Sequence, residues 1–143
     1  MTTVSVFDVA TFILREKQVM SAMKLQKLLY YCQAWSLVWD GHPLFEEPIE
    51  AWANGPVVPT LFKVHEDQYQ IDFSFMQSYG NPDRLNEEQQ ETVRSVLHYY
   101  ANKPSQWLSD LTHLERPWRD ARKGLTEKER GHREISLISM ESY

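Results

Sequence analysis

The sequence predicts a mainly α fold, a compact single-domain helical structure with room for one small two-stranded hairpin. Three long segments carry apolar residues at helical spacing, each preceded by a candidate N-cap residue. The chain has 143 residues, of which 42% are hydrophobic, and this suits one domain with a substantial core. No internal repeat, low-complexity tract or linker divides it, so we expect one domain over residues 1–143.

The N-terminal part predicts two helices. In residues 5–17, Ser5 is a candidate N-cap with Asp8 three residues further on, and the apolar residues follow the 3.6-residue period. Ser21 then precedes the clearest apolar stripe of the sequence, which ends at Gly41. We therefore expect a long central helix after Ser21.

The middle of the chain is less regular, because prolines remove backbone donors and restrict the residue before them. Four of them interrupt it: Pro43, Pro48, Pro56 and Pro59. Residues 49–52 are a candidate strand, and Pro59 is a suitable first residue for a helix that reaches about residue 69. Residues 71–76 are partly apolar at alternate positions and are expected to form a second short strand or a loop.

The C-terminal part predicts a turn and further helices. Asn86 precedes an acidic first turn, which suits the helix dipole. Ser105 is a candidate N-cap, and Pro117 suits the first turn of a helix. The elements expected are a turn at 80–83, helices at 86–100, 105–111 and 117–123, and a last amphipathic turn or two from 136.

No segment carries the pattern of a metal, phosphate or nucleophile site. The five histidines never lie four residues apart and Cys32 is the single cysteine, so no zinc spacing exists. Glycine-rich phosphate loops and a GxSxG turn are absent. Glu46, Glu47 and Glu50 lack the alternating ligands of a calcium loop. We expect no metal and no cofactor, and we interpret Cys32 as a core residue.

Charge and hydropathy exclude other classes. The net charge of -5 argues against a general affinity for nucleic acid, although residues 116–133 hold seven basic and three acidic side chains. No apolar run approaches the ~20 residues that span a bilayer. The N-terminus lacks the basic and apolar regions of a signal peptide. We expect a cytoplasmic protein without a membrane segment.

Two segments are richer in polar and aromatic residues than packing requires. In residues 24–31, Lys24 and Lys27 share a helix face, while Gln26 lies on another side. In residues 111–122, an enzyme could use His113 as a base, with Glu115 nearby and Arg119 as an anion clamp. The structural alternative there is a network of caps and salt bridges, in which Thr112 or His113 satisfies a helix end and Trp118 fills the core.

Five short motifs carry a resemblance to a known family. They are KLQKLLYY at 24–31, IEAW at 49–52, GPVVP at 55–59, LSDLTH at 108–113 and PWRDAR at 117–122. In this order they resemble the Panacea (SocA-like) antitoxin domain, which is also labelled a phage-associated protein of the GepA type. The match runs from about residue 6 to the C-terminus. Residues 136–143 resemble the start of the family's last helix, which would then be truncated.

The resemblance implies an antitoxin of a bacterial or prophage type II toxin–antitoxin pair. Such a domain neutralises a cognate toxin protein, encoded nearby, by direct binding, and no catalytic activity is implied. The alternatives are an enzyme that reverses a toxin's covalent modification, with hydrolase-like activity around His113, and an adaptor that delivers a partner for proteolysis. A nucleic-acid role for the basic stretch is a further, weaker alternative.

The motif residues divide into two expected sets. Gly55 permits a positive φ angle, and the ring of Pro56 fixes the φ angle of that residue. This turn could therefore present Trp52 and Asn54 at an exposed corner, with Lys24 and Lys27 beside it. The candidates for partner binding are Lys24, Lys27, Tyr31, Trp52, Asn54, Gly55 and Pro56. The residues expected to organise the scaffold are Gln26, Thr112, His113, Pro117, Trp118, Arg119 and Arg122.

Overall fold

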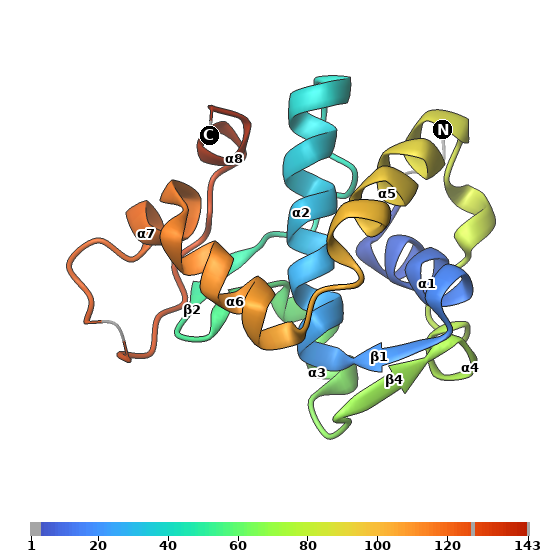
Figure 1. The fold of residues 1–143 in the computed structure, drawn as a ribbon, viewed down its shortest axis with the longest axis horizontal. Helices are drawn as coiled ribbons and strands as arrows, with labels where there is room; N and C mark the ends of the chain where they lie inside the picture. Colours follow the sequence, from blue (N-terminus) through green and yellow to red (C-terminus); the bar gives the residue numbers. More distant parts are fainter. Residues whose placement is uncertain (1–3, 127, 143) are drawn as a thin grey trace.

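Helix α2 (Ala22–Asp40) runs through the centre of the molecule, and the other elements surround it (Figure 1). Helices α1 (Val6–Lys17) and α5 (Glu87–Tyr100) pack on one side of α2. Helices α6 (Ser105–Leu114) and α8 (Leu137–Ser142) contact it from the other. The predicted mainly helical, single-domain fold is confirmed.

The computed structural model describes residues 4–126 and 128–142. Its core is continuous across the helices, because α2 is buried around most of its circumference. Leu25, Leu28, Leu29 and Cys32 are fully buried there. Burial raises the pKa of the Cys32 thiol, which fits the predicted role as a core residue.

The three longest helices begin at the N-caps that the sequence predicts. The Ser5 hydroxyl accepts a hydrogen bond from the Asp8 backbone, and the Asp8 side chain accepts one from Ser5 in return. The Ser21 hydroxyl caps α2. Asn86 and Gln89 form a second reciprocal capping pair at the start of α5. Each of these signals lies within four residues of chain, so the sequence is sufficient to reveal it.

Two pairs of short strands complete the fold. Strands β2 (Glu50–Trp52) and β3 (Gly55–Val57) form an antiparallel hairpin. The sequence left room for one small hairpin and indicated the first of these strands at 49–52, but not the second. Strands β1 (Val19–Ser21) and β4 (Gln70–Asp72) form a second antiparallel pair that the sequence did not predict. About fifty residues separate these two strands in the chain, and periodicity within one segment carries no information about such a partner.

Several boundaries differ from those expected. Residues 71–76, expected to be one strand or a loop, divide between β4 and the short helix α4 (Phe73–Met76), which Asp72 caps. Pro104, and not Ser105, occupies the N-cap of α6, so no side chain caps that helix. The remaining elements are α3 (Pro59–His65), which ends before the expected residue 69, a 3₁₀ turn η1 (Pro82–Arg84), and α7 (Arg116–Ala121).

Candidate functional site

The segment that joins α2 to α3, residues 42–58, is called the strap here. It includes the β2–β3 hairpin and lies along α2. Buried polar side chains of α2 attach its backbone at several points. The Gln33 side chain accepts hydrogen bonds from the backbone nitrogens of Leu44 (2.8 Å) and Phe45 (3.2 Å) and donates one to the Phe45 carbonyl (2.8 Å). One amide therefore satisfies three backbone groups that the irregular strap would otherwise leave buried and unpaired.

Gln26 makes the equivalent attachment two helical turns earlier. Its side-chain oxygen accepts from the Val58 backbone nitrogen at 2.8 Å, and its amide nitrogen lies 3.4 Å from the Val58 carbonyl. The same nitrogen lies 2.9 Å from Nε2 of His65, a buried residue of α3. Because the amide nitrogen is a donor, His65 Nε2 accepts and its ring proton lies on Nδ1. Burial lowers the pKa of His65, which favours this neutral form.

Lys27 is buried beneath the hairpin turn, with 1% of its surface exposed. Its Nζ donates to the Pro56 carbonyl at 3.2 Å, and burial lowers its pKa to about 7. Gly55 lies directly above the lysine with φ of 123°, a conformation that side chains disfavour. A Cβ at Gly55 would lie 2.5 Å from Lys27 Cε, so both the backbone angle and the available space require glycine.

The α7 region attaches the first strand of the hairpin. Trp118 Nε1 donates to the Trp52 carbonyl at 2.7 Å. Arg122 is buried and donates to the Ala51 carbonyl at 3.0 Å. The same guanidinium donates to the carbonyls of Thr126 and Glu129 and lies over the Trp118 ring. The hairpin is therefore fixed through its backbone from two sides, by α2 and by the α7 region.

The candidate partner-binding residues differ in exposure. Lys27, Tyr31, Gly55 and Pro56 are buried, so the expectation that Lys27 projects beside the turn is corrected. Asn54 is exposed, and Trp52 and Lys24 are half-buried. Burial, together with the charge of Lys17, lowers the pKa of Lys24. Partner binding by the seven residues stays a prediction, and direct contact in this conformation is open to the three with accessible surface.

The residues expected to organise the scaffold also divide. Gln26, Trp118 and Arg122 make the backbone contacts described above. Thr112 and Pro117 are buried, and the Thr112 hydroxyl donates to the Ser109 carbonyl within α6. Arg119 is exposed. A structural role of the set as a whole stays a prediction, and within residues 4–126 and 128–142 the Arg119 side chain makes no hydrogen bond or ion pair that favours it.

The residues of the enzyme hypothesis are directed to separate partners. His113 stacks on Trp118 with ring centroids 4.0 Å apart. The Glu115 carboxylate accepts a hydrogen bond from Tyr31 at 3.0 Å, on the side of α2. Arg119 faces solvent. A base and an anion clamp need a common space for a substrate, and these contacts do not create one.

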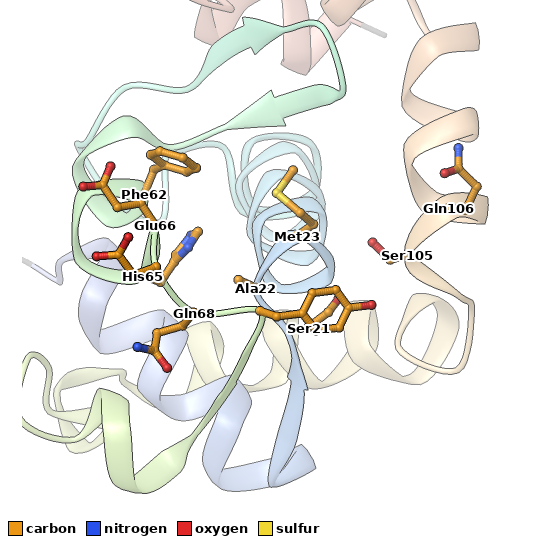
Figure 2. Close-up of a pocket in the computed structure, with 11 residues that line it drawn as sticks. Ser21, Ala22, Met23, Phe62, His65, Glu66, Gln68, Ser105 and Gln106 are labelled. Carbon is orange, nitrogen blue, oxygen red and sulfur yellow. The ribbon is translucent and has the colours of Figure 1, made fainter.

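Two neighbouring hollows share Met23 and Phe62, and one of them borders the corner of the hairpin. The larger, of about 660 Å³, lies between the start of α2, helix α3 and the start of α6. Figure 2 shows Met23 between Phe62 and His65 on one side and Ser105 and Gln106 on the other. The second, of about 450 Å³, follows the hairpin and is also lined by Met23 and Phe62. Its other lining residues are Trp52, Ala53, Asn54, Val57, Arg130, Gly131 and His132.

Contacts around the corner fix its position. The Ser109 hydroxyl of α6 donates to the Asn54 carbonyl at 2.6 Å. The Trp52 indole donates to the Glu50 carboxylate at 2.9 Å, and its ring meets Phe62 edge-on with centroids 4.9 Å apart. Trp52 and Asn54 are thus held in place and keep accessible surface beside the second hollow. We call the two hollows together the corner groove.

Sequence reasoning missed several residues of this region. Met23 and Phe62 join the two hollows, and His132 meets the Trp52 ring with centroids 5.6 Å apart. No local pattern marks these residues, because α2, α3 and the C-terminal segment meet only in the folded chain. Gln33 was missed despite a usable signal: it lies seven residues after Gln26, hence on the same helix face, and it is polar within an apolar stripe.

Two kinds of feature are absent from the residues that the structure describes. Across residues 4–126 and 128–142, no helix has the length and apolar character needed to cross a membrane. Within the same ranges, no three histidine, cysteine, aspartate or glutamate side chains cluster as a metal site would require.

Comparison with known proteins identifies one family. A model of the family described as "Antitoxin SocA-like, Panacea domain" matches residues 25–119. The matched range runs from α2 through α6 into α7, and it contains the strap and the corner groove's Trp52, Asn54 and Phe62. No curated protein and no solved structure matches the chain.

Proposed function

The chain belongs to the family of SocA-like antitoxins with a Panacea domain, and from this membership we propose that it is an antitoxin that neutralises a toxin protein by direct binding. The toxin would be encoded beside it in a bacterial or prophage genome, and the pair would act in the cytoplasm. The family match is the observation that carries this proposal. The geometry of the corner groove supports a binding role for one particular surface.

The support from geometry begins with preorganisation. The hairpin backbone is hydrogen-bonded by Lys27, Trp118 and Arg122, and the strap behind it by Gln26 and Gln33. A surface that is already ordered loses little conformational entropy when a partner binds. The corner therefore presents Trp52 and Asn54 in a fixed arrangement.

The chemistry of the groove also suits a protein partner. Trp52, Met23 and Phe62 provide apolar surface, and aromatic residues and methionine are enriched at protein interfaces. Asn54 and Arg130 provide polar groups along the same groove. An apolar centre with polar groups around it is the usual anatomy of an interface, and tryptophan is prominent among hot-spot residues.

Binding is proposed over catalysis because of the contacts around His113. In the enzyme hypothesis His113 and Arg119 would act on one substrate, whereas His113 stacks on Trp118 and Arg119 faces solvent. Delivery of the toxin to a protease would use the same binding surface. It is a second outcome of binding and does not compete with the proposed interaction.

The test is co-expression with the adjacent open reading frame, followed by purification through a tag on this chain. We expect restored growth and a stable complex. Growth without a complex would favour the enzyme hypothesis, and neither growth nor a complex would overturn the proposed function. Toxin that disappears only in the presence of a cellular protease would identify the adaptor mode.

Matched variants locate the surface. Trp52→Ala removes the half-buried ring but retains the backbone carbonyl that Trp118 binds. We expect the dissociation constant of the complex to rise about 30-fold, since hot-spot truncations cost about 2 kcal/mol or more. Tyr79→Ala is the control, because Tyr79 is half exposed and packs on Phe7 of α1, away from the groove. Equal affinities for the two variants would exclude the corner groove as the interface.

A further inference from the structure

A smaller cavity of about 140 Å³ lies apart from the corner groove, between α2, the end of α5, the α6–α7 junction and α8. Four aromatic side chains line it: Tyr30, Tyr31, Trp35 and Tyr100. Glu115 and Met140 lie in the same wall, and Val38, which is 46% exposed, lies where the cavity meets solvent. We call this cavity the aromatic pocket.

Hydrogen bonds and ring contacts fix the walls of the aromatic pocket. The Tyr31 and Tyr100 rings are stacked, with centroids 4.2 Å apart and planes at 10°. Trp35 Nε1 donates to the Tyr100 hydroxyl at 3.1 Å. The Tyr31 hydroxyl donates to Glu115 Oε1 at 3.0 Å. The aromatic walls and the carboxylate are therefore arranged before any ligand arrives.

Glu115 is a partly buried carboxyl group that has no cationic partner in the part of the chain that the structure describes. Among the described residues, no lysine, arginine or histidine nitrogen lies within 4.0 Å of its carboxylate. Burial raises its pKa to about 7, against the opposing effect of the Tyr31 hydrogen bond. An ionised carboxylate removed from water is costly unless it is paired, so a cation that enters the pocket would be favoured.

We propose that the aromatic pocket receives the cationic head of a lysine or arginine side chain from the toxin partner. The identity of the partner rests on the proposed function, whereas the chemistry of the pocket does not. Aromatic rings attract cations through their negative faces, and a nearby carboxylate adds a direct charge interaction. A cavity of about 150 Å³ holds a benzene-sized molecule, so one guanidinium or ammonium head fits this volume.

The test uses small cations and no toxin. The probes are n-butylguanidinium and n-butylammonium, and n-pentanol is the neutral control of similar length. The readout is the NMR signal of ¹³C-labelled methionine methyl groups at pH 8, where Glu115 is ionised. We expect saturable shifts of the Met140 methyl with both cations and no saturable shift with pentanol. Met20 and Met76, which are buried elsewhere in the core, are internal controls.

Two variants make the result specific. Glu115→Gln retains the shape and a hydrogen-bond acceptor for Tyr31 but removes the charge, and we expect at least a fivefold rise in the dissociation constant of the cations. Glu87→Gln is the matched control, because Glu87 is exposed at the opposite end of α5 from Tyr100. Each of three results would overturn the inference. They are a Met140 methyl signal that does not shift with the cations, equal binding of pentanol, and an unchanged affinity for the cations in Glu115→Gln.

A further arm connects the pocket to the complex. If the toxin complex forms, Glu115→Gln should weaken it while Glu87→Gln leaves it unchanged. If no complex forms, the proposed function fails, but the cation titration still reports on the pocket. Cation binding together with a complex that is insensitive to Glu115→Gln would show that the toxin does not use this pocket.

Discussion

The two faces of the β2–β3 hairpin are built in different ways. On the buried face, three side chains from elsewhere in the fold donate to hairpin carbonyls: Arg122 to Ala51, Trp118 to Trp52 and Lys27 to Pro56. On the exposed face, the side chains of Trp52 and Asn54 border the corner groove. The buried face thus contacts the backbone of the hairpin, while the exposed face presents its side chains.

This difference separates the scaffold from the proposed binding surface. A hydrogen bond to a carbonyl does not depend on which side chain that residue carries. Exposed positions such as Asn54 can therefore be changed without loss of the contacts that hold the hairpin. Motifs such as those around Lys27 and Trp118 accordingly identify the fold, and in the proposed function the choice of partner falls to the residues that face the groove.

Breaking the buried face should have the largest effect on stability. Arg122→Met leaves the buried Ala51 carbonyl without this donor, which costs about 1–3 kcal/mol, and it also removes the charge-assisted hydrogen bonds to the carbonyls of the exposed residues Thr126 and Glu129. We expect a loss of about 3 kcal/mol or more in the free energy of unfolding, measured in urea. Arg119 is exposed in α7, which ends just before Arg122, and Arg119→Met should change the free energy of unfolding by less than about 0.5 kcal/mol. Similar losses in both variants would contradict the assigned role of Arg122.

A smaller loss should follow from closing the space above Lys27. Gly55→Ala places a methyl group 2.5 Å from Lys27 Cε at a φ of 123°, and we expect a loss of about 2–3 kcal/mol. Gly41→Ala is the control: its φ is also positive, at 78°, but no atom lies within 4 Å of the added Cβ. That variant should lose about 1 kcal/mol.

A double-mutant cycle isolates the steric part of the Gly55 effect. The melting temperature that Gly55→Ala lowers should be partly restored when Lys27→Ala is added, because the clashing Cε is then absent. Strictly additive losses would show that backbone strain alone explains the requirement for glycine.

The buried lysine predicts a pH-dependent stability. Since the pKa of Lys27 falls from 10.5 to about 7 on folding, the unfolded chain binds more protons between these values, and stability should rise with pH there. The full effect of one such group is about 1.4 kcal/mol per pH unit. Urea unfolding at pH 7 to 9 should show this rise in the parent relative to Lys27→Met.

The quantity to compare is the difference in the free energy of unfolding between the parent and Lys27→Met at each pH. Burial also raises the pKa of Tyr31 and Cys32, and these groups lower stability as the pH becomes strongly alkaline. They are present in both proteins, so their contribution cancels in the difference. A parent and a Lys27→Met variant with parallel pH profiles would argue that Lys27 remains charged in the folded protein.

Glu115 should change the pH dependence of stability in the opposite direction from Lys27, and more weakly. Its pKa is raised from 4.5 to about 7 on folding, so the folded chain binds more protons in that interval and stability should fall as the pH rises through it. Partial solvent access reduces the size of this fall. Between pH 5 and 7, the melting temperature should decline less steeply with pH in Glu115→Gln than in the parent protein. An equal decline in the parent and the variant would assign it to other groups.

The exposed face should show the smallest change in stability. Asn54→Ala leaves the Asn54 carbonyl free to accept the Ser109 hydroxyl, so we expect a change within about 0.5 kcal/mol. If the corner groove binds the toxin, the same variant should weaken the complex, as titration calorimetry would measure. A large loss of stability with unchanged affinity would reverse the distinction between the two faces.

Local signals made much of the fold predictable. Ser5, Ser21 and Asn86 cap helices because capping involves groups within four residues, and the apolar stripe of α2 predicted the central helix. The β1–β4 pair was not predictable, since its strands are three residues long and distant in the chain. The N-cap at Pro104 was missed because the neighbouring Ser105 is the residue type that usually caps.

The candidate site was less accessible to sequence reasoning. The segments that contain Trp52 and Asn54 were identified as important, but Met23 and Phe62, which join the two hollows, had no local pattern to mark them. The aromatic pocket brings Tyr31 to Glu115 across 84 positions of the chain. Such convergence depends on tertiary packing, which a single sequence does not display.

The sequence by itself determined the helical class, the main caps, the burial of Cys32 and, through its ordered motifs, the family. Only the tertiary structure decided which polar residues are buried. Lys24 and Lys27 share a face by helical spacing, yet Lys24 retains accessible surface while Lys27 lies beneath the hairpin. The reason is physical: helical periodicity fixes the direction of a side chain from its own helix, but burial depends on which distant segment covers it, and here that segment is the strap.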